Sequence, residues 1–145
     1  MKTINQFRGQ YYWLSNFYTA PIEVDGIHYL NNEAAFQAAK CNNFKDRVFF
    51  SDLAANEAKW LGRRIQLRED WEQIKDEEMY KAVLAKFTQN PDLMEKLLQT
   101  ENTELIEGNT WNDRYWGVDL KTGKGENRLG KILMRVRKEL QEDNV

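Results

Sequence analysis

Residues 31–40, Asn-Asn-Glu-Ala-Ala-Phe-Gln-Ala-Ala-Lys, constrain the fold more than any other stretch of this chain. Four of the ten are alanine, the best helix former, and no glycine or proline interrupts them. The paired asparagines supply an N-cap, and Glu33 falls in the first turn, where the helix dipole favours a negative charge. We therefore predict a helix that runs to about Cys41 and that other elements approach closely, because most of its sides carry only methyl groups.

Three polar side chains share one face of this predicted helix. At about 100° per residue, Glu33, Gln37 and Lys40 fall within an arc of about 60°, and Phe36 flanks that arc. A buried helix carries a carboxylate, an amide and an ammonium together only where they line a pocket or pair with one another. The alternative is a surface helix whose polar stripe faces water, which is the commoner case for an isolated segment. The rest of the chain favours the first alternative, so we expect the stripe to line an active site.

Composition bounds the class of protein. A length of 145 residues with 41% hydrophobic side chains predicts one domain, residues 1–145, with a sizeable core. The net charge of −2 means that any affinity for nucleic acid must come from a local basic patch. One cysteine excludes an internal disulfide, and one histidine argues against a zinc site, so no metal or other cofactor is expected. No long apolar run or signal peptide is present, which predicts a cytoplasmic protein without membrane contact.

The pattern along the chain predicts an α+β fold that is rich in helices and has a small antiparallel sheet. Residues 22–24 and 27–29 flank Asp25-Gly26, which is typical of a hairpin with a two-residue turn. Asp70 is expected to act as the N-cap of a capping box. The other expected elements are a short helix or turn at 46–50, a helix at 56–62 closed by a glycine C-cap, helices from 76 to 90, after 91 and after 130, an extended segment at 7–18 and strands at 65–67 and 104–107.

Several catalytic arrangements are excluded by the motifs that the chain lacks. It has neither a G-x-G-x-x-G fingerprint nor a Walker-type phosphate loop, and a single His and a single Cys leave no nucleophilic triad. Carboxylates, lysines, arginines and aromatic residues remain. These groups suit the cleavage of a glycosidic bond, where a carboxylate stabilises an oxocarbenium ion while the leaving group departs.

Two further sets of residues are candidates for this chemistry. Asp113 lies in a loop with Trp111 and Trp116, where partial burial would raise its pKa enough for acid catalysis; the alternative is an ordinary loop cap. The other set consists of candidate phosphate contacts: Arg63, Arg64, Gly125, Asn127 and Gly130. The alternatives are that the arginines are ordinary solvated surface residues and that loop geometry requires the others.

Eight short blocks occur in a fixed order along the chain. They are Phe7-x-Gly9, Leu14-Ser-Asn16-Phe17-Tyr18, Glu33-Ala-Ala-Phe36-Gln37-Ala-Ala-Lys40, Ala58-Lys59 with Gly62-Arg63, Arg68-x-Asp70-Trp71, Lys86-Phe87-x-Gln89-Asn90, Asp113-x-x-Trp116-Gly117, and Gly125-x-Asn127-x-Leu129-Gly130-Lys131-x-Leu133-Met134-x-Val136-Arg137. In these blocks the chain resembles the NADAR family, also called YbiA-like, over residues 7–140. One block would be weak evidence, whereas eight in order are specific.

The resemblance implies a YbiA-like fold and an N-glycosidase that acts on ribose-based substrates. Some family members are associated with cleaving ribosylamino-pyrimidine phosphates, which are intermediates of riboflavin synthesis. Others are associated with removing ADP-ribose from guanine in nucleic acid. The expected partners are therefore a ribosyl phosphate or ADP-ribosyl substrate and ADP-ribosylated nucleic acid, and the oligomeric state stays open. Ala34 and Thr100-Glu101 depart from the family pattern and leave the choice of substrate open.

The resemblance also suggests roles for single residues. Glu33 is expected below the ribose, where it orients water or stabilises charge at C1, and Asp113 is expected at the ribose hydroxyls or the leaving base. Lys40 is expected to pair with Glu33, to bind phosphate or to form a Schiff base with C1 of an opened ribose. The expected substrate contacts are Asn16, Phe17, Phe36, Gln37, Arg63, Arg64, Trp71, Lys86, Trp116, Gly117, Asn127 and Gly130. The competing function is a non-catalytic module that binds ADP-ribose or a related nucleotide.

Overall fold

The Asp25-Gly26 turn joins strands β2 (Thr19–Val24) and β3 (Ile27–Asn31). Both turn residues have positive φ, 51° and 84°, as a two-residue hairpin of the favoured hand requires. The strands pair antiparallel, with Val24 opposite Ile27. The predicted hairpin is thus confirmed in this computed structural model, which describes residues 2–143.

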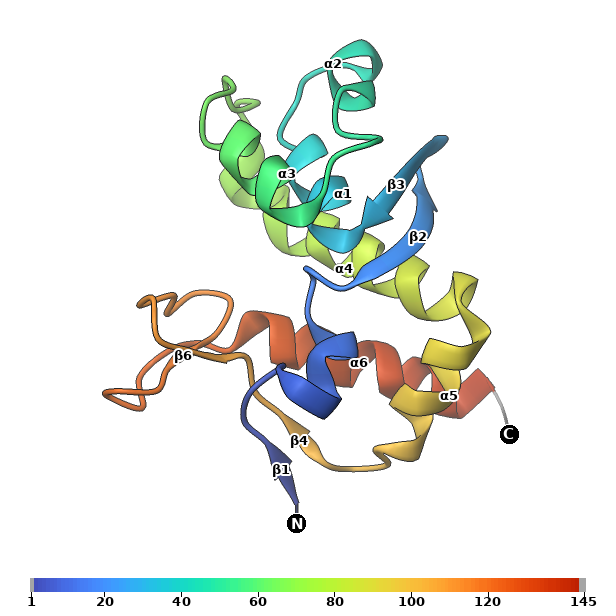
Figure 1. The fold of residues 1–145 in the computed structure, drawn as a ribbon, viewed down its shortest axis with the longest axis vertical. Coiled ribbons are helices and arrows are strands. Elements are labelled where there is room, and N and C mark those ends of the chain that lie inside the picture. Colours follow the sequence, from blue (N-terminus) through green and yellow to red (C-terminus); the bar gives the residue numbers. More distant parts are fainter. Residues whose placement is uncertain (1, 144–145) are drawn as a thin grey trace. The chain divides into compact units, whose positions relative to one another are not determined.

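Helix α1 (Asn32–Ala38) follows β3 directly. The Asn31 side-chain oxygen accepts a hydrogen bond from the Ala34 N–H at 2.7 Å, which makes Asn31 the N-cap. Every residue of α1 is buried, which confirms the prediction of a buried alanine-rich helix, but the helix ends at Ala38 rather than near Cys41, so Lys40 lies beyond its last turn. Its alanines belong to one apolar cluster with Ala58 of α3 (Ala55–Gly62) and Ala82 of α4 (Trp71–Gln89). The three helices pack together, as Figure 1 shows.

Three predictions in this region are wrong. Helix α4 begins at Trp71 rather than at residue 76, and Asp70 makes no capping hydrogen bond with its side chain. Its carboxylate instead accepts from the Arg68 Nε at 2.7 Å, so an ion pair replaces the expected capping box. Residues 65–67 form no strand. The short helix expected near residue 46 is α2 (Phe44–Val48).

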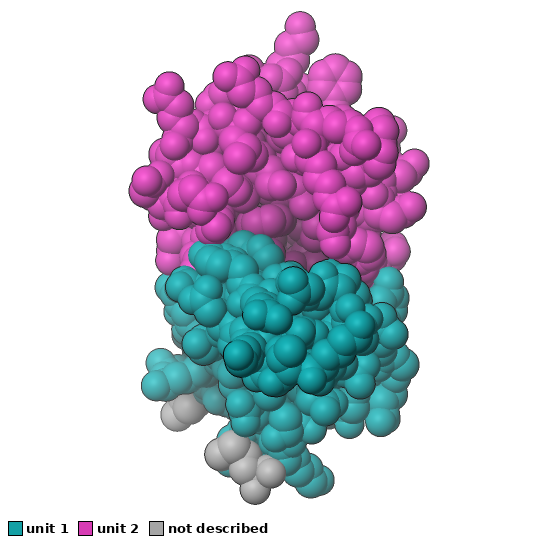
Figure 2. Space-filling view, turned by 90° about the vertical axis from the view of Figure 1, so that its left-hand side faces the viewer, with its two compact units in different colours: residues 1–15, 92–145 teal, residues 16–91 magenta. Residues whose placement is uncertain are grey.

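These elements make up unit 2, residues 16–91, one of the two compact units into which the chain divides (Figure 2). Unit 1 combines both ends of the described chain, residues 2–15 and 92–143. Its helices are α5 (Pro91–Gln99), whose first residue belongs to unit 2, and α6 (Arg128–Asp143). Its strands are β1 (Thr3–Ile4), β4 (Glu104–Leu105), β5 (Gly108–Asn109) and β6 (Val118–Asp119).

Unit 1 has little sheet. Strand β1 pairs parallel with β4, and β5 pairs parallel with β6. The extended segment predicted at 7–18 is wrong over most of its length, because Gly9–Leu14 form a 3-10 helix. Helix α6 buries one apolar face, including Leu133 and Val136, and packs against β4.

Helices with three two-stranded sheets, of which β2–β3 is antiparallel, confirm the predicted α+β class. The prediction of a single domain stays a prediction. Among residues 2–143, no helix combines the length and the apolar character that crossing a bilayer requires.

Candidate functional site

Glu33 and Gln37 form a buried pair on α1. Their side chains are 8% and 5% exposed, and the Gln37 Nε2 donates a hydrogen bond to the Glu33 Oε1 at 2.8 Å. Burying a carboxylate is costly unless hydrogen bonds compensate it, and this amide supplies one of them. The alternative of a solvated surface ladder does not hold for these two residues. Glu33 and Gln37 are instead an enclosed polar pair in a helix whose other residues are apolar except for Asn32.

The Gln37 side chain also explains Gly62, the last residue of α3. A Cβ at Gly62 would lie 1.9 Å from the Gln37 Oε1 and 2.6 Å from its Cδ. The predicted glycine C-cap is wrong, because the C-cap residue of α3 is Arg63, which has ordinary right-handed backbone angles. Gly62 is therefore needed for the close approach of α3 to α1. The Gln37 Oε1 that it faces is buried and has no hydrogen-bond partner.

Gly62→Ala is expected to destabilise the protein by up to about 2 kcal/mol. Overpacking costs about 1–3 kcal/mol, and the better helix propensity of alanine returns about 1 kcal/mol. In a Gln37→Ala background the contacts with the Gln37 Oε1 and Cδ are gone and only the Cβ contact at 3.2 Å remains, so the same change should be neutral or stabilise by up to about 1 kcal/mol. Urea unfolding of the four proteins measures both values. A stabilising effect of Gly62→Ala in the wild-type background would contradict this account of the contact.

Lys40 lies at the end of the stripe and is half-buried. Its Nζ lies 6.0 Å from the centre of the Trp71 ring, and that ring packs against Phe36 with 5.2 Å between ring centres. Burial lowers the pKa of Lys40 from its ordinary value; the positive charge of Arg63 acts in the same direction, and Glu33 opposes both. The predicted contacts Phe36, Trp71 and Arg63 therefore gather around the Lys40 end of α1.

Residues just before β2 approach the other end of α1. The Asn16 carbonyl accepts from the Glu33 N–H at 3.1 Å, and the Asn16 Oδ1 accepts from the Asn32 side chain at 3.3 Å. Phe17 follows, with the Lys59 Nζ 5.7 Å from its ring centre. Asn16 thus lies beside Glu33 and Phe17 follows it in the chain, while their role as substrate contacts stays a prediction; sequence reasoning did not name Asn32 and Lys59. The only sequence signal for these two was their place within or next to the matching blocks.

The two remaining predicted residues of unit 2 already have protein partners. Lys86 is 1% exposed, and its Nζ lies 5.5 Å from the ring centre of Tyr18 and 5.2 Å from that of Phe87. Arg64 is exposed, stacks on Trp60 at 3.8 Å and donates a hydrogen bond to the Trp60 carbonyl. The predicted roles of Lys86 in substrate binding and of Arg64 in phosphate binding stay predictions.

Asp113 and Trp116 belong to unit 1. The Asp113 Oδ1 accepts hydrogen bonds from the backbone N–H groups of Tyr115 and Trp116, at 3.1 and 3.0 Å. This is the loop-cap arrangement that was the alternative to acid catalysis. The half-buried Trp116 packs edge-on against Tyr115, with 4.8 Å between ring centres.

Three other predicted substrate contacts in unit 1, Asn127, Gly130 and Gly117, have a role in the fold of this unit. The Asn127 side chain accepts from the Glu107 N–H and donates to the Leu105 carbonyl, both at 2.9 Å. A Cβ at Gly130 would lie 2.1 Å from the same Leu105 carbonyl, and one at Gly117 would lie 2.1 Å from the Glu107 carbonyl. Close backbone approach therefore accounts for both glycines. Their predicted role in holding a ligand stays a prediction.

The structure thus gathers one group of predicted residues within unit 2, along α1 and its neighbours: Asn16, Phe17, Glu33, Phe36, Gln37, Lys40, Arg63 and Trp71. Among residues 2–143, no cluster of three or more His, Cys, Asp or Glu side chains is placed to hold a metal ion. The chemistry that this group offers is that of a buried carboxylate, an amine of lowered pKa and two aromatic rings.

Comparison with known proteins places the chain. The family model described as the NADAR domain matches residues 4–141. The chain belongs to the NADAR family. A solved relative, the Escherichia coli protein YbiA, has the same fold: the match has a TM-score of 0.88 and 37% identity and covers 99% of this chain and 87% of that one.

Curated relatives of this NADAR domain carry functional names. N-glycosidase YbiA of Escherichia coli (strain K12) is 39% identical over 87% of this chain and 79% of its own length. Riboflavin biosynthesis protein VVA0006 of Vibrio vulnificus is 41% identical over 90% of this chain and 36% of its own length. N-glycosidase Npun_R5314 of Nostoc punctiforme is 37% identical over 88% of this chain and 84% of its own length.

Proposed function

We propose that this protein is an N-glycosidase that hydrolyses the bond between C1 of a ribose and a nitrogen of its base, with Glu33 and Lys40 as the catalytic groups. The observation that carries the proposal is the buried pair of Glu33 and Gln37 beside an amine of lowered pKa. The enzyme class agrees with the names of the relatives in Escherichia coli and Nostoc punctiforme. A cytoplasmic location is part of the proposal.

Glu33 acts on the positive charge that develops at C1. As the C1–N bond stretches, the ribose becomes an oxocarbenium ion, and a fixed carboxylate in a dry site stabilises that ion more strongly than it stabilises the neutral substrate. The hydrogen bond from the Gln37 Nε2 holds the carboxylate in one orientation before the reaction begins. The same carboxylate orients the water that attacks C1. Trp71 and Phe36 supply flat apolar surface for the sugar or the base.

The substrate carries a ribosyl group with phosphate. The name of the relative from Vibrio vulnificus, a riboflavin biosynthesis protein, favours ribosylamino-pyrimidine phosphates as the substrate. ADP-ribosylated guanine is the other candidate. Arg63, exposed next to Lys40, is the group in unit 2 best placed to meet phosphate. A non-catalytic module would bind the same compounds and leave them intact.

A hydrolysis assay on both substrates decides between these functions. The protein is incubated in parallel with the ribosylamino-pyrimidine phosphate and with an oligonucleotide ADP-ribosylated on guanine, and the released ribosyl product is measured by chromatography. We expect turnover of at least one. Binding of either compound without any released product would identify a binding module and overturn the proposal.

A further inference from the structure

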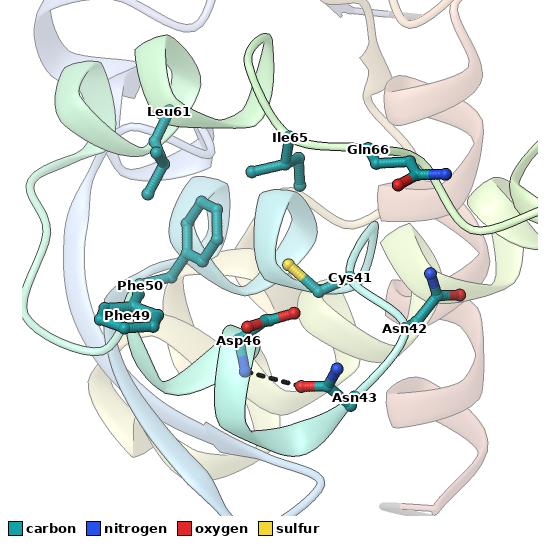
Figure 3. A pocket seen from close by; sticks show the side chains of 9 residues that line it. All are labelled: Cys41, Asn42, Asn43, Asp46, Phe49, Phe50, Leu61, Ile65 and Gln66. Atoms are coloured by element: carbon teal, nitrogen blue, oxygen red, sulfur yellow. Dashed lines mark hydrogen bonds between the residues drawn. The ribbon is translucent and has the colours of Figure 1, made fainter.

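A second recess in unit 2 takes no part in the site described above. It is a cavity of about 470 Å³ between the end of α1, α2 and the segment after α3 (Figure 3). This volume lies within the range of sites that hold small organic molecules, about 300–1,000 Å³. Glu33, Gln37 and Lys40 do not line it. The cavity is therefore available to a group other than the ribose at the catalytic residues.

The lining has an apolar side and a polar side. Phe49, Phe50, Leu61 and Ile65 form the apolar side, and Figure 3 shows Leu61 and Ile65 across from the two phenylalanines. The polar side carries the Asp46 carboxylate, which points toward the buried Cys41, and the amides of Asn42 and Gln66. The nearby Asn43 is engaged in capping α2, because its Oδ1 accepts from the Asp46 N–H at 2.9 Å. Apolar faces with one polar edge fit a planar heterocycle.

The chain segment that lines the cavity is basic although the protein is not. Residues 40–66, which include every lining residue, hold six basic and three acidic residues, a net charge of +3, whereas the whole chain has −2. Three of the four aromatic side chains of this segment, Phe44, Phe49 and Trp60, are exposed, and Phe49, at the cavity, is 65% exposed. Positive charge with accessible aromatic rings is the usual combination for binding single-stranded nucleic acid. The same charge disfavours a cationic peptide side chain as the occupant.

The Asp46 carboxylate indicates which hydrogen-bonding groups the molecule bound in the cavity presents to it. A carboxylate accepts two parallel hydrogen bonds best from two adjacent N–H donors. Among the four common bases, guanine alone presents such a pair, its ring N1–H and its 2-amino group. The amides of Asn42 and Gln66 are then able to donate to the neighbouring carbonyl O6.

We propose that this cavity binds a guanine base of single-stranded nucleic acid, with Asp46 accepting from the base edge and Phe49 stacking on its face. The base bound here is not the one whose C1–N bond is cleaved. The inference deepens the proposed function and rests on its nucleic-acid substrate, for which the cavity gives a second point of attachment.

Binding of unmodified DNA tests the cavity without any turnover. Fluorescence anisotropy compares two labelled eight-nucleotide single strands that differ in one central base, guanine or hypoxanthine, which lacks the 2-amino group. The wild-type protein should bind the guanine strand about tenfold more tightly. Asp46→Asn should remove this difference. The amide has an NH2 group in place of one carboxylate oxygen, so it cannot accept hydrogen bonds from both N–H groups of guanine. Phe49→Ala should weaken both strands about tenfold.

Asp52→Asn is the matched control, because Asp52 is exposed, lies outside the lining and gives the same change of charge. It should keep the preference for guanine. Equal binding of the two strands by the wild-type protein, or a preference that persists in Asp46→Asn, would overturn the inference, as would the absence of binding at low salt. Circular dichroism confirms that each variant is folded. Because the readout is equilibrium binding, it is separate from the hydrolysis assay, and either proposal can fail without the other.

Discussion

Glu33→Gln is expected to lower kcat by about 10³-fold while the substrate still binds. Glutamine has the size of glutamate, and its side-chain oxygen can still accept from the Gln37 Nε2, so the local packing should persist. Glutamine lacks the negative charge that stabilises the transition state. That charge contributes far less to binding of the neutral ground state, so the Kd should change little. Steady-state kinetics on the better of the two substrates give kcat, and calorimetry with that substrate gives the Kd.

The control for this substitution is Glu69→Gln, which removes the same charge from an exposed position of unit 2. Its kcat should stay within about twofold of wild type, since exposed charges at a distance are screened by salt. A Glu33→Gln enzyme with wild-type kcat would remove the carboxylate from the mechanism. A lost affinity with unchanged kcat would mean that Glu33 only binds the substrate.

The parts of this protein that sequence predicts well are those fixed by neighbouring residues. The hairpin follows from Asp25-Gly26, whose positive φ angles only such residues adopt readily. The start of α1 follows from Asn31, whose side chain caps the helix three residues later. The stripe of Glu33 and Gln37 follows from helical spacing, and the alanines around it predicted that it would be buried. Each inference used interactions that span at most four residues.

The predictions that were wrong or that remain open depend on distant partners. Gly62 looked like a C-cap, but its partner is Gln37, which lies 25 residues earlier in the chain. Asp70 is an exception to this rule: it occupies the N-cap position of α4, but its carboxylate accepts from Arg68, only two residues away, instead of capping the helix. Asn127 looked free to bind phosphate, yet its side chain bonds Leu105 and Glu107. Periodicity carries no information about such pairs.

The second large effect is expected at Lys40. If its amine attacks C1 of the opened ribose, a bond from C1 to Nζ forms as the bond to the base breaks, the base leaves with a proton, and water later hydrolyses the imine. Lys40→Met and Lys40→Arg should then both lose about 10³-fold in kcat, a barrier increase of about 4 kcal/mol. Arginine fails because it stays charged and cannot act as a nucleophile. Borohydride added during turnover should trap a ribosyl adduct on Lys40, which peptide mass spectrometry locates.

The pH dependence separates this role from the two alternatives. Burial and Arg63 lower the pKa of Lys40 below the ordinary lysine value of 10.5, so the neutral amine becomes abundant at a lower pH than in free lysine. A nucleophilic Lys40 therefore gives a rate that rises with pH through this lowered pKa and then levels off. If Lys40 instead pairs with Glu33 or binds phosphate, it acts as the charged ammonium, so the rate would fall as the pH rises through the pKa of Lys40. Lys40→Arg would then keep much of the activity. Lys81→Arg is the control, because the Lys81 Nζ pairs with Asp25 at 2.7 Å and takes no part in the site, and it should leave the profile unchanged. An active Lys40→Arg enzyme without a trapped adduct would exclude the covalent route and leave Glu33 to stabilise C1 alone.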